Sequence, residues 1–163
     1  MATQAISVDT LPSYNPATGE TLEQISKTRQ EELPAIVSRA RVAQEKWRET
    51  SIDQRRALLV QLKQTLLAAR NDLAAIVVRE SGKPHVEALF SDVFVSLDTA
   101  AYYEMNLAKL LRPERVTHHS SAAKLKSGKL YYEPLGVVGI VSSWNYPLAI
   151  PMGQIIAAIA VAK

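Results

Sequence analysis

Apolar side chains recur at helical spacing through the N-terminal part of the chain. Positions three or four residues apart form stripes that would face a common core, which predicts a series of amphipathic helices between Leu33 and Leu107. The predicted core-facing residues are Leu33, Ile36, Val37, Ala40, Ala43, Trp47, Leu58, Leu59, Leu62, Leu66, Leu67, Leu73, Ile76, Val77, Val86, Leu89, Phe90, Val93, Phe94, Leu97, Ala101 and Leu107.

Local signals place the ends of these helices. Thr28–Glu31 and Ser51–Gln54 have the spacing of a capping box, in which two side chains bond free amides at the helix start. Pro34 leaves the first start ambiguous, because proline is tolerated only in the first helical turn. Asn71–Asp72 suggests a break, and Ser81–Pro84 ends the pattern with a glycine followed by a proline.

Two stretches have the pattern of β-hairpins. Ser13–Glu20 is typical of a turn with a short strand on each side, because Asn-Pro starts turns and Gly19 permits a positive φ. Further along, segments 122–126 and 129–133 are expected to pair across a Ser127–Gly128 turn.

The last segment changes character. Residues 135–141 are apolar and β-branched without alternation, which is typical of a strand buried on both faces of a parallel sheet. After the irregular stretch 142–147, an apolar helix is predicted. One strand and one helix cannot cover each other's faces and edges, so the pattern indicates the truncated start of a larger α/β unit. A tail anchor is the alternative for 148–162, but that run is shorter than the roughly 20 residues that a bilayer requires and contains Pro151.

Composition fits one ordinary soluble domain. Of 163 residues, 47% are hydrophobic and 21% charged, and the formal net charge is +3. The densest basic cluster, Lys124, Lys126 and Lys129, falls in the second hairpin, which favours charges on one strand face over a nucleic-acid site. Met1–Pro12 lacks the pattern of a secretory signal. We therefore expect a cytoplasmic protein with no nucleic-acid partner and no membrane attachment.

Cysteine is absent from the sequence. Disulfides, thiolate metal sites and mechanisms with a sulfur nucleophile are thereby excluded within these residues. His85, His118 and His119 have no partners at metal-ligand spacing, so no metal site is expected.

Three segments carry a family resemblance. The longest is Glu133–Leu148 (EPLGVVGIVSSWNYPL), and it follows Asn15–Glu20 (NPATGE) and Glu80–Pro84 (ESGKP). In this order, with Trp47 in the helical pattern between the first two, they resemble the N-terminal portion of the NAD(P)-dependent aldehyde dehydrogenase superfamily. Ser143 departs from the proline that many members carry before the Trp-Asn pair.

The resemblance implies an α/β fold with an N-terminal helical segment, a β-hairpin arm and the first β–α unit of an incomplete Rossmann-like cofactor domain. It implies an N-terminal tail over 1–12, the mainly helical part of the cofactor-binding domain over 13–112, a hairpin resembling the oligomerisation arm over 113–134, and the start of the NAD(P)-binding core over 135–163. The alternative for the arm is an ordinary surface hairpin.

The resemblance also implies a reaction, the NAD(P)+-dependent oxidation of an aldehyde to a carboxylic acid, in a full-length homo-oligomer. Asn145 takes the position of the amide that stabilises the oxyanion, although a turn asparagine that caps the following helix is the alternative. Val141, Ser142, Ser143 and Trp144 would line the cofactor cleft for NAD or NADP, with a core or interface aromatic as the alternative for Trp144.

The family's nucleophilic cysteine and general-base glutamate lie beyond residue 163 in the resemblance. We therefore expect the isolated chain to be inactive. The alternative function is a non-catalytic truncated product that associates with a full-length homologue.

Overall fold

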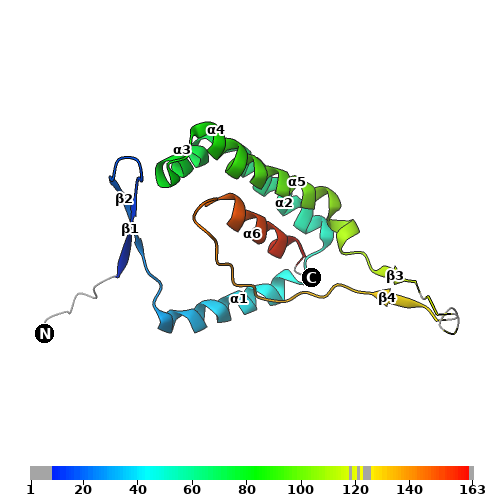
Figure 1. The fold of residues 1–163 in the computed structure, drawn as a ribbon. Helices are drawn as coiled ribbons and strands as arrows, with labels where there is room; N and C mark the ends of the chain where they lie inside the picture. The colour runs from blue at the N-terminus through cyan, green and yellow to red at the C-terminus, as the bar shows by residue number, and fades with distance from the viewer. Residues whose placement is uncertain (1–8, 118, 121, 123–125, 162–163) are drawn as a thin grey trace, which may run out of the picture.

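The structure, a computed structural model, describes residues 9–117, 119–120, 122 and 126–161 and is mixed α/β (Figure 1). Its strands are β1 (Thr10–Tyr14), β2 (Thr21–Ser26), β3 (Glu114–Val116) and β4 (Gly128–Leu130). Its helices are the 3-10 turn η1 (Gln30–Glu32), α1 (Leu33–Trp47), α2 (Ile52–Ala68), α3 (Arg70–Ser81), α4 (His85–Glu87), the π-helical η2 (Ala88–Phe94), α5 (Val95–Leu110) and α6 (Ala149–Val161).

The first predicted hairpin is confirmed. β1 pairs with β2 in antiparallel register across the Asn-Pro turn. The Asn15 side chain accepts a hydrogen bond from the Ala17 amide at 2.9 Å, and Gly19 has a φ of 73°. A left-handed residue and an Asx turn therefore close the hairpin, as the sequence predicts.

The two predicted capping boxes have different outcomes. Ser51 accepts from the Gln54 amide at 3.2 Å while the Gln54 side chain accepts from the Ser51 amide at 2.8 Å, which confirms the box that starts α2. The box at Thr28 is wrong. Arg29 holds the capping position before η1 without a side-chain bond, and α1 begins at Leu33.

The break between the next two helices comes earlier than predicted. α2 ends at Ala68, and Ala69, with φ −88° and ψ 6°, separates it from α3. Asn71 already lies in the first turn of α3. The other end of α3 is as predicted, since Gly82 adopts a left-handed φ of 72°.

A π-helical turn changes which face of the next helix is buried. Phe90 and Phe94 within this turn are exposed, as is Val86 in α4 before it, so the predicted inward orientation of all three is wrong. A π turn contains more residues than an α turn, and the 3.6-residue extrapolation drifts off the core face when it crosses one. The buried residues of this stretch are Ala88, Asp92, Val93, Ser96 and Ala100, and of these only Val93 is among the residues predicted to face the core.

Two clusters form the core, and α6 with the residue before it contributes to both. Ile156 and Ala160 of α6 pack with Leu59 of α2 and with Ala100 and Leu107 of α5. At the other end, Leu148 packs against a second cluster made of Ala74, Val77, Ala88 and Val93. Figure 1 shows α6 lying between α1 and the α2–α5 pair. No helix among the described residues has both the length and the apolar character that crossing a membrane requires.

The second hairpin has a different partner strand from the predicted one. β4 pairs antiparallel with β3, with Arg115 opposite Lys129 and Val116 opposite Gly128. Gly128 therefore lies within a strand rather than at a turn. Of the predicted strand 122–126, residues 123–125 lie outside the described part. The paired strands project away from the helices as an arm (Figure 1).

Residues 135–141 do not form the predicted strand. The segment carries no strand pairing, and its ends are almost fully exposed, with Leu135 at 91% and Val141 at 96%. A strand needs a neighbour to accept and donate its backbone hydrogen bonds, and each of the described strands pairs only within one of the two hairpins. The helix predicted after residue 147 is confirmed as α6.

Candidate active site

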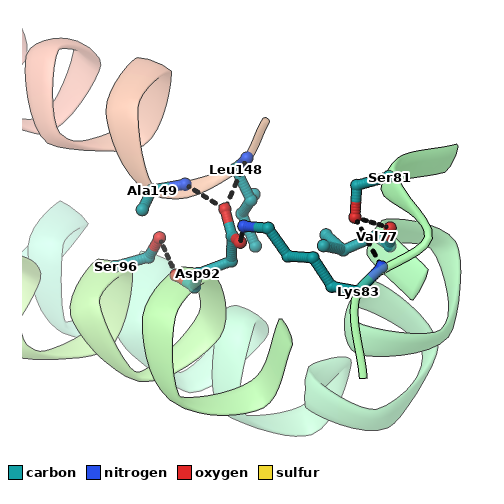
Figure 2. Close-up of polar contacts among 7 residues, drawn as sticks. All are labelled: Val77, Ser81, Lys83, Asp92, Ser96, Leu148 and Ala149. Carbon is teal, nitrogen blue, oxygen red and sulfur yellow. Dashed lines mark hydrogen bonds and ion pairs between the residues drawn. The ribbon is translucent and has the colours of Figure 1, made fainter. Parts of the chain in front are cut away.

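The start of α6 is capped by a side chain from a distant helix. The amides of Leu148 and Ala149 both donate to Oδ1 of Asp92, each at 3.0 Å (Figure 2). Asp92 lies in η2 and is fully buried. Its carboxylate satisfies two of the amides that the first helical turn leaves without partners, and its negative charge suits the positive end of the helix dipole.

The second oxygen of the same carboxylate binds a lysine. Nζ of Lys83 lies 2.9 Å from Oδ2 of Asp92, and the lysine side chain is only 12% exposed. The same ammonium group lies 3.8 Å from the ring centroid of Tyr146, within the range of a cation–π contact. One buried ion pair thus contacts both the loop before α6 and the first residues of the helix.

Lys83 is itself positioned by the end of α3. Gly82 turns the chain left-handed, and the Lys83 amide donates to Oγ of Ser81 at 3.4 Å, while Ser81 donates to the carbonyl of Val77 (Figure 2). A Cβ atom at Gly82 would lie 3.0 Å from Cγ of Pro16 in the β1–β2 turn. The three segments that carried the family resemblance are therefore linked by contacts, from Pro16 to Gly82 and Lys83 and on to the start of α6.

Asn145 is exposed in the loop that connects β4 to α6. Its side chain makes no hydrogen bond with the described residues, and the α6 amides that it could have capped are bound by Asp92. The interpretation of Asn145 as a helix cap is therefore wrong. Trp144 beside it is 88% exposed, so this residue is not a core aromatic in the described structure.

The other predicted site residues lie in the same exposed segment. Val141, Ser142 and Ser143 are exposed, and their proximity to Asn145 follows from adjacency in the sequence alone. A cavity of about 560 Å³ lies elsewhere, at the ends of α5 and α6, and its walls include Leu135 and Tyr132 but none of the predicted site residues.

One polar contact lies in the wall of that cavity. The hydroxyl of Tyr132 donates to Glu114 at 2.8 Å, and this hydrogen bond raises the pKa of Tyr132. His85 and His119 are exposed, and His118 lies outside the described residues. No group of three potential metal ligands occurs within the described part of the chain.

Sequence reasoning missed Asp92 and gave Lys83 only a place in a turn. Two signals were available. A lone charged residue in the mostly apolar stretch 88–97 points to a buried carboxylate with a partner. The residues before α6 also end in Tyr-Pro-Leu, which supplies no side-chain cap, so the cap had to come from elsewhere.

Comparison with known proteins identifies the family. The model of the aldehyde dehydrogenase family matches residues 3–162, almost the entire chain. The chain therefore belongs to the aldehyde dehydrogenase family, as the three sequence segments indicated.

Individual relatives match over a limited part of their length. An aldehyde dehydrogenase-like protein of Schizosaccharomyces pombe is 33% identical over 92% of this chain, but the match covers 28% of that protein. The NAD+ complex of an aldehyde dehydrogenase from Bacillus cereus superposes with a TM-score of 0.82 at 28% identity, over 94% of this chain and 31% of that one. The NADP complex of a glyceraldehyde-3-phosphate dehydrogenase from Bacillus halodurans C-125 shares the fold, with a TM-score of 0.83 at 23% identity, over 95% and 33%. The mixed α/β fold is thereby confirmed, and the chain spans about a third of these proteins.

Proposed function

We propose that this chain forms the N-terminal part of an NAD(P)+-dependent aldehyde dehydrogenase, in which the side-chain amide of Asn145 donates a hydrogen bond to the oxyanion. Attack of a thiolate on an aldehyde places negative charge on the former carbonyl oxygen, and a preorganised donor at that oxygen lowers the barrier. The thiolate has to come from outside these residues, because the sequence contains no cysteine.

The observation that carries this proposal is the exposed side-chain amide of Asn145, which makes no hydrogen bond with the described residues, beside a helix start at which Asp92 already binds two backbone amides. An asparagine that caps its own helix accepts with its Oδ1 atom, and this bond fixes the orientation of the side chain. Here Asp92 accepts from the amides at the helix start, so the Asn145 side chain is not held against the helix and its N–H groups can turn toward a ligand.

Val141, Ser142, Ser143 and Trp144 complete the proposed site as the lining of the cofactor cleft. When bound there, NAD or NADP accepts the hydride that leaves the substrate carbon. The NAD+ and NADP complexes of the two Bacillus enzymes support this assignment without choosing between the two nucleotides. The exposed Trp144 and Val141 offer apolar surface to a flat ring system.

The proposed division of the chain into parts is the one that the family resemblance implies. Residues 13–112 form the mainly helical part of the cofactor-binding domain, 113–134 the oligomerisation arm, and 135–163 the start of the cofactor-binding core, after a tail over 1–12. Support for the arm comes from the β3–β4 pair, whose outer edges have no described partner strand and are open to pairing with another subunit.

Two assays test the proposal. The chain alone, mixed with an aldehyde and NAD+ or NADP+, should give no aldehyde-dependent NAD(P)H, because a sulfur nucleophile is missing. A chimera in which this chain replaces the matching N-terminal segment of the Bacillus cereus enzyme, called the Bacillus chimera below, should form NADH. A folded chimera that binds NAD+ but has no activity would count against the proposal, as would turnover by the pure chain.

The exposed apolar residues support a second candidate function. Leu135, Val141 and Trp144 present apolar side chains that a homologous subunit could cover. In that case the chain is a non-catalytic partner of a full-length aldehyde dehydrogenase. Co-sedimentation of the labelled chain with the full-length Bacillus cereus enzyme would show a stable complex, whereas the first candidate requires only that the chimera is active.

A further inference from the structure

We infer that Lys83 and Asp92 are positioning residues for Asn145, and that their ion pair holds the turn that presents the amide. The catalytic meaning of this inference rests on the proposed function, but its structural content does not. Asn145 precedes Tyr146 directly and lies three residues before Leu148, and both of these later residues contact the ion pair.

The geometry leaves the loop little freedom on its C-terminal side. Asp92 fixes the backbone at Leu148 and Ala149 through two hydrogen bonds to one oxygen. The ammonium group of Lys83, which is paired with the other oxygen of the same carboxylate, restrains the ring of Tyr146 through the cation–π contact. On the N-terminal side of Asn145, the exposed Trp144 and Val141 have no such anchor. The backbone at Asn145 is therefore restrained mainly by the contacts of the residues that follow it, Tyr146, Leu148 and Ala149.

Each member of the pair depends on the other. Asp92 is fully buried, so its negative charge requires the lysine and the two amides as compensation. Removing Lys83 leaves a buried carboxylate with less compensation, and removing Asp92 leaves two helix amides open. In both cases the contacts that restrain the loop weaken together, because they all depend on the same ion pair.

Burial alone does not explain this arrangement. Ser96 lies one turn further along the same buried stripe and donates only to the backbone carbonyl of Asp92, at 2.7 Å (Figure 2). It is as buried as Asp92 but contacts neither the loop nor α6 through its hydroxyl. Ser96→Ala therefore removes a buried polar group from the same helix and leaves the carboxylate contacts in place, which makes it the matched control.

The absence of cysteine allows a direct test in the chain itself. Asn145→Cys carries a single nitroxide label, whose electron paramagnetic resonance spectrum reports motion at that position. A label at Ser38→Cys on the exposed side of α1 reports changes in the whole molecule. The labels are compared in backgrounds with Lys83→Met, Lys83→Arg, Asp92→Asn and Ser96→Ala.

The inference expects a shift to faster, nanosecond motion at position 145 in Lys83→Met and Asp92→Asn. The spectra should stay unchanged in Ser96→Ala and in Lys83→Arg, which keeps the cation. Equal motion at position 145 in all backgrounds would overturn the inference. So would equal loss of order at both label sites in Lys83→Met, because the pair would then serve general stability only.

Hydrogen exchange provides a second readout that tolerates association of the chain. In Asp92→Ala, the amides of Leu148 and Ala149 should exchange about tenfold to a hundredfold faster, the effect of losing a charge-assisted hydrogen bond. Unchanged exchange would also overturn the inference.

The Bacillus chimera separates this inference from the proposed function. If Asn145→Ala leaves kcat unchanged, the oxyanion role fails while the label and exchange results still decide whether Lys83 and Asp92 hold the turn. If Asn145→Ala lowers kcat and Lys83→Met does not, the positioning role fails and the oxyanion role stands. If the oxyanion role and the positioning role are both correct, Lys83→Met lowers kcat with little effect on KM for NAD+. In a chimera that already carries Asn145→Ala, Lys83→Met should then cause little further loss of kcat.

Discussion

The indole N–H of Trp47 donates a hydrogen bond of 3.0 Å to the backbone carbonyl of Ile159, joining residues 112 positions apart. This carbonyl belongs to the last turn of α6, where carbonyl groups have no partner within the helix. The bond fastens α1 to the helix that follows the candidate site.

Trp47→Phe keeps an aromatic ring but removes this bond. We expect it to lower the free energy of unfolding by about 0.5–1.5 kcal/mol, the usual net value of one hydrogen bond, with urea denaturation as the measurement. Tyr102→Phe on the exposed side of α5 is the control and should change little. Equal effects of the two variants would mean that the Trp47 bond contributes nothing.

Two glycines separate backbone strain from steric contact. Gly19 and Gly82 have nearly the same positive φ, 73° and 72°, but only Gly82 has a close neighbour, Pro16. Alanine should cost about 1–2 kcal/mol at both positions because of its left-handed conformation. Gly82→Ala should cost more than Gly19→Ala, since its Cβ would also displace the β1–β2 turn. Equal midpoints of urea denaturation for the two variants would contradict a destabilising contact between the new Cβ at position 82 and Pro16.

The capping residues give a matched pair on exposed helix starts. Ser51→Ala should lower the free energy of unfolding by about 1 kcal/mol, because it removes the hydroxyl that accepts from the Gln54 amide, although the backbone amide at position 51 can still donate to the Gln54 side chain. Thr28→Ala should stay within about 0.5 kcal/mol of the parent, since η1 has no side-chain cap. If Thr28→Ala lowered the free energy of unfolding as much as Ser51→Ala, Thr28 would act as a helix cap, which would contradict the structure.

Exposed apolar residues near the candidate site predict self-association. Leu135 and Val141 are 91% and 96% exposed in a segment without strand partners, and Trp144 follows them. We expect sedimentation of the chain to show association at micromolar concentration. Leu135→Ser combined with Val141→Ser should weaken it, while Ser38→Ala on α1 should not. A monomeric parent chain that binds no hydrophobic dye would contradict this prediction.

The sequence predicted features that depend on neighbouring residues. The Asn15 turn, the cap at Ser51 and the helix end at Gly82 each need only a few adjacent residues, and the structure confirms all three. The family segments were also sufficient to identify the family.

Features that depend on distant partners were missed. The π turn in η2 moved Phe90 and Phe94 off the core face, and the segment 135–141 lacks the neighbour that a strand requires. The cap of α6 comes from Asp92, which lies 56 residues before Leu148, so no local pattern could connect them. Within the candidate site, the roles of Val141, Ser142, Ser143, Trp144 and Asn145 come from the family resemblance and stay predictions, whereas the ion pair of Lys83 and Asp92 was missed.

The catalytic constant of the Asn145→Ala variant tests the central claim most directly. In the Bacillus chimera, the loss of one oxyanion donor should lower kcat by about 100- to 1,000-fold and change KM for the aldehyde much less. Asn71→Ala, an exposed asparagine in the first turn of α3, is the control and should keep full activity. A chimera with Asn145→Ala that retains near-normal kcat would contradict the account.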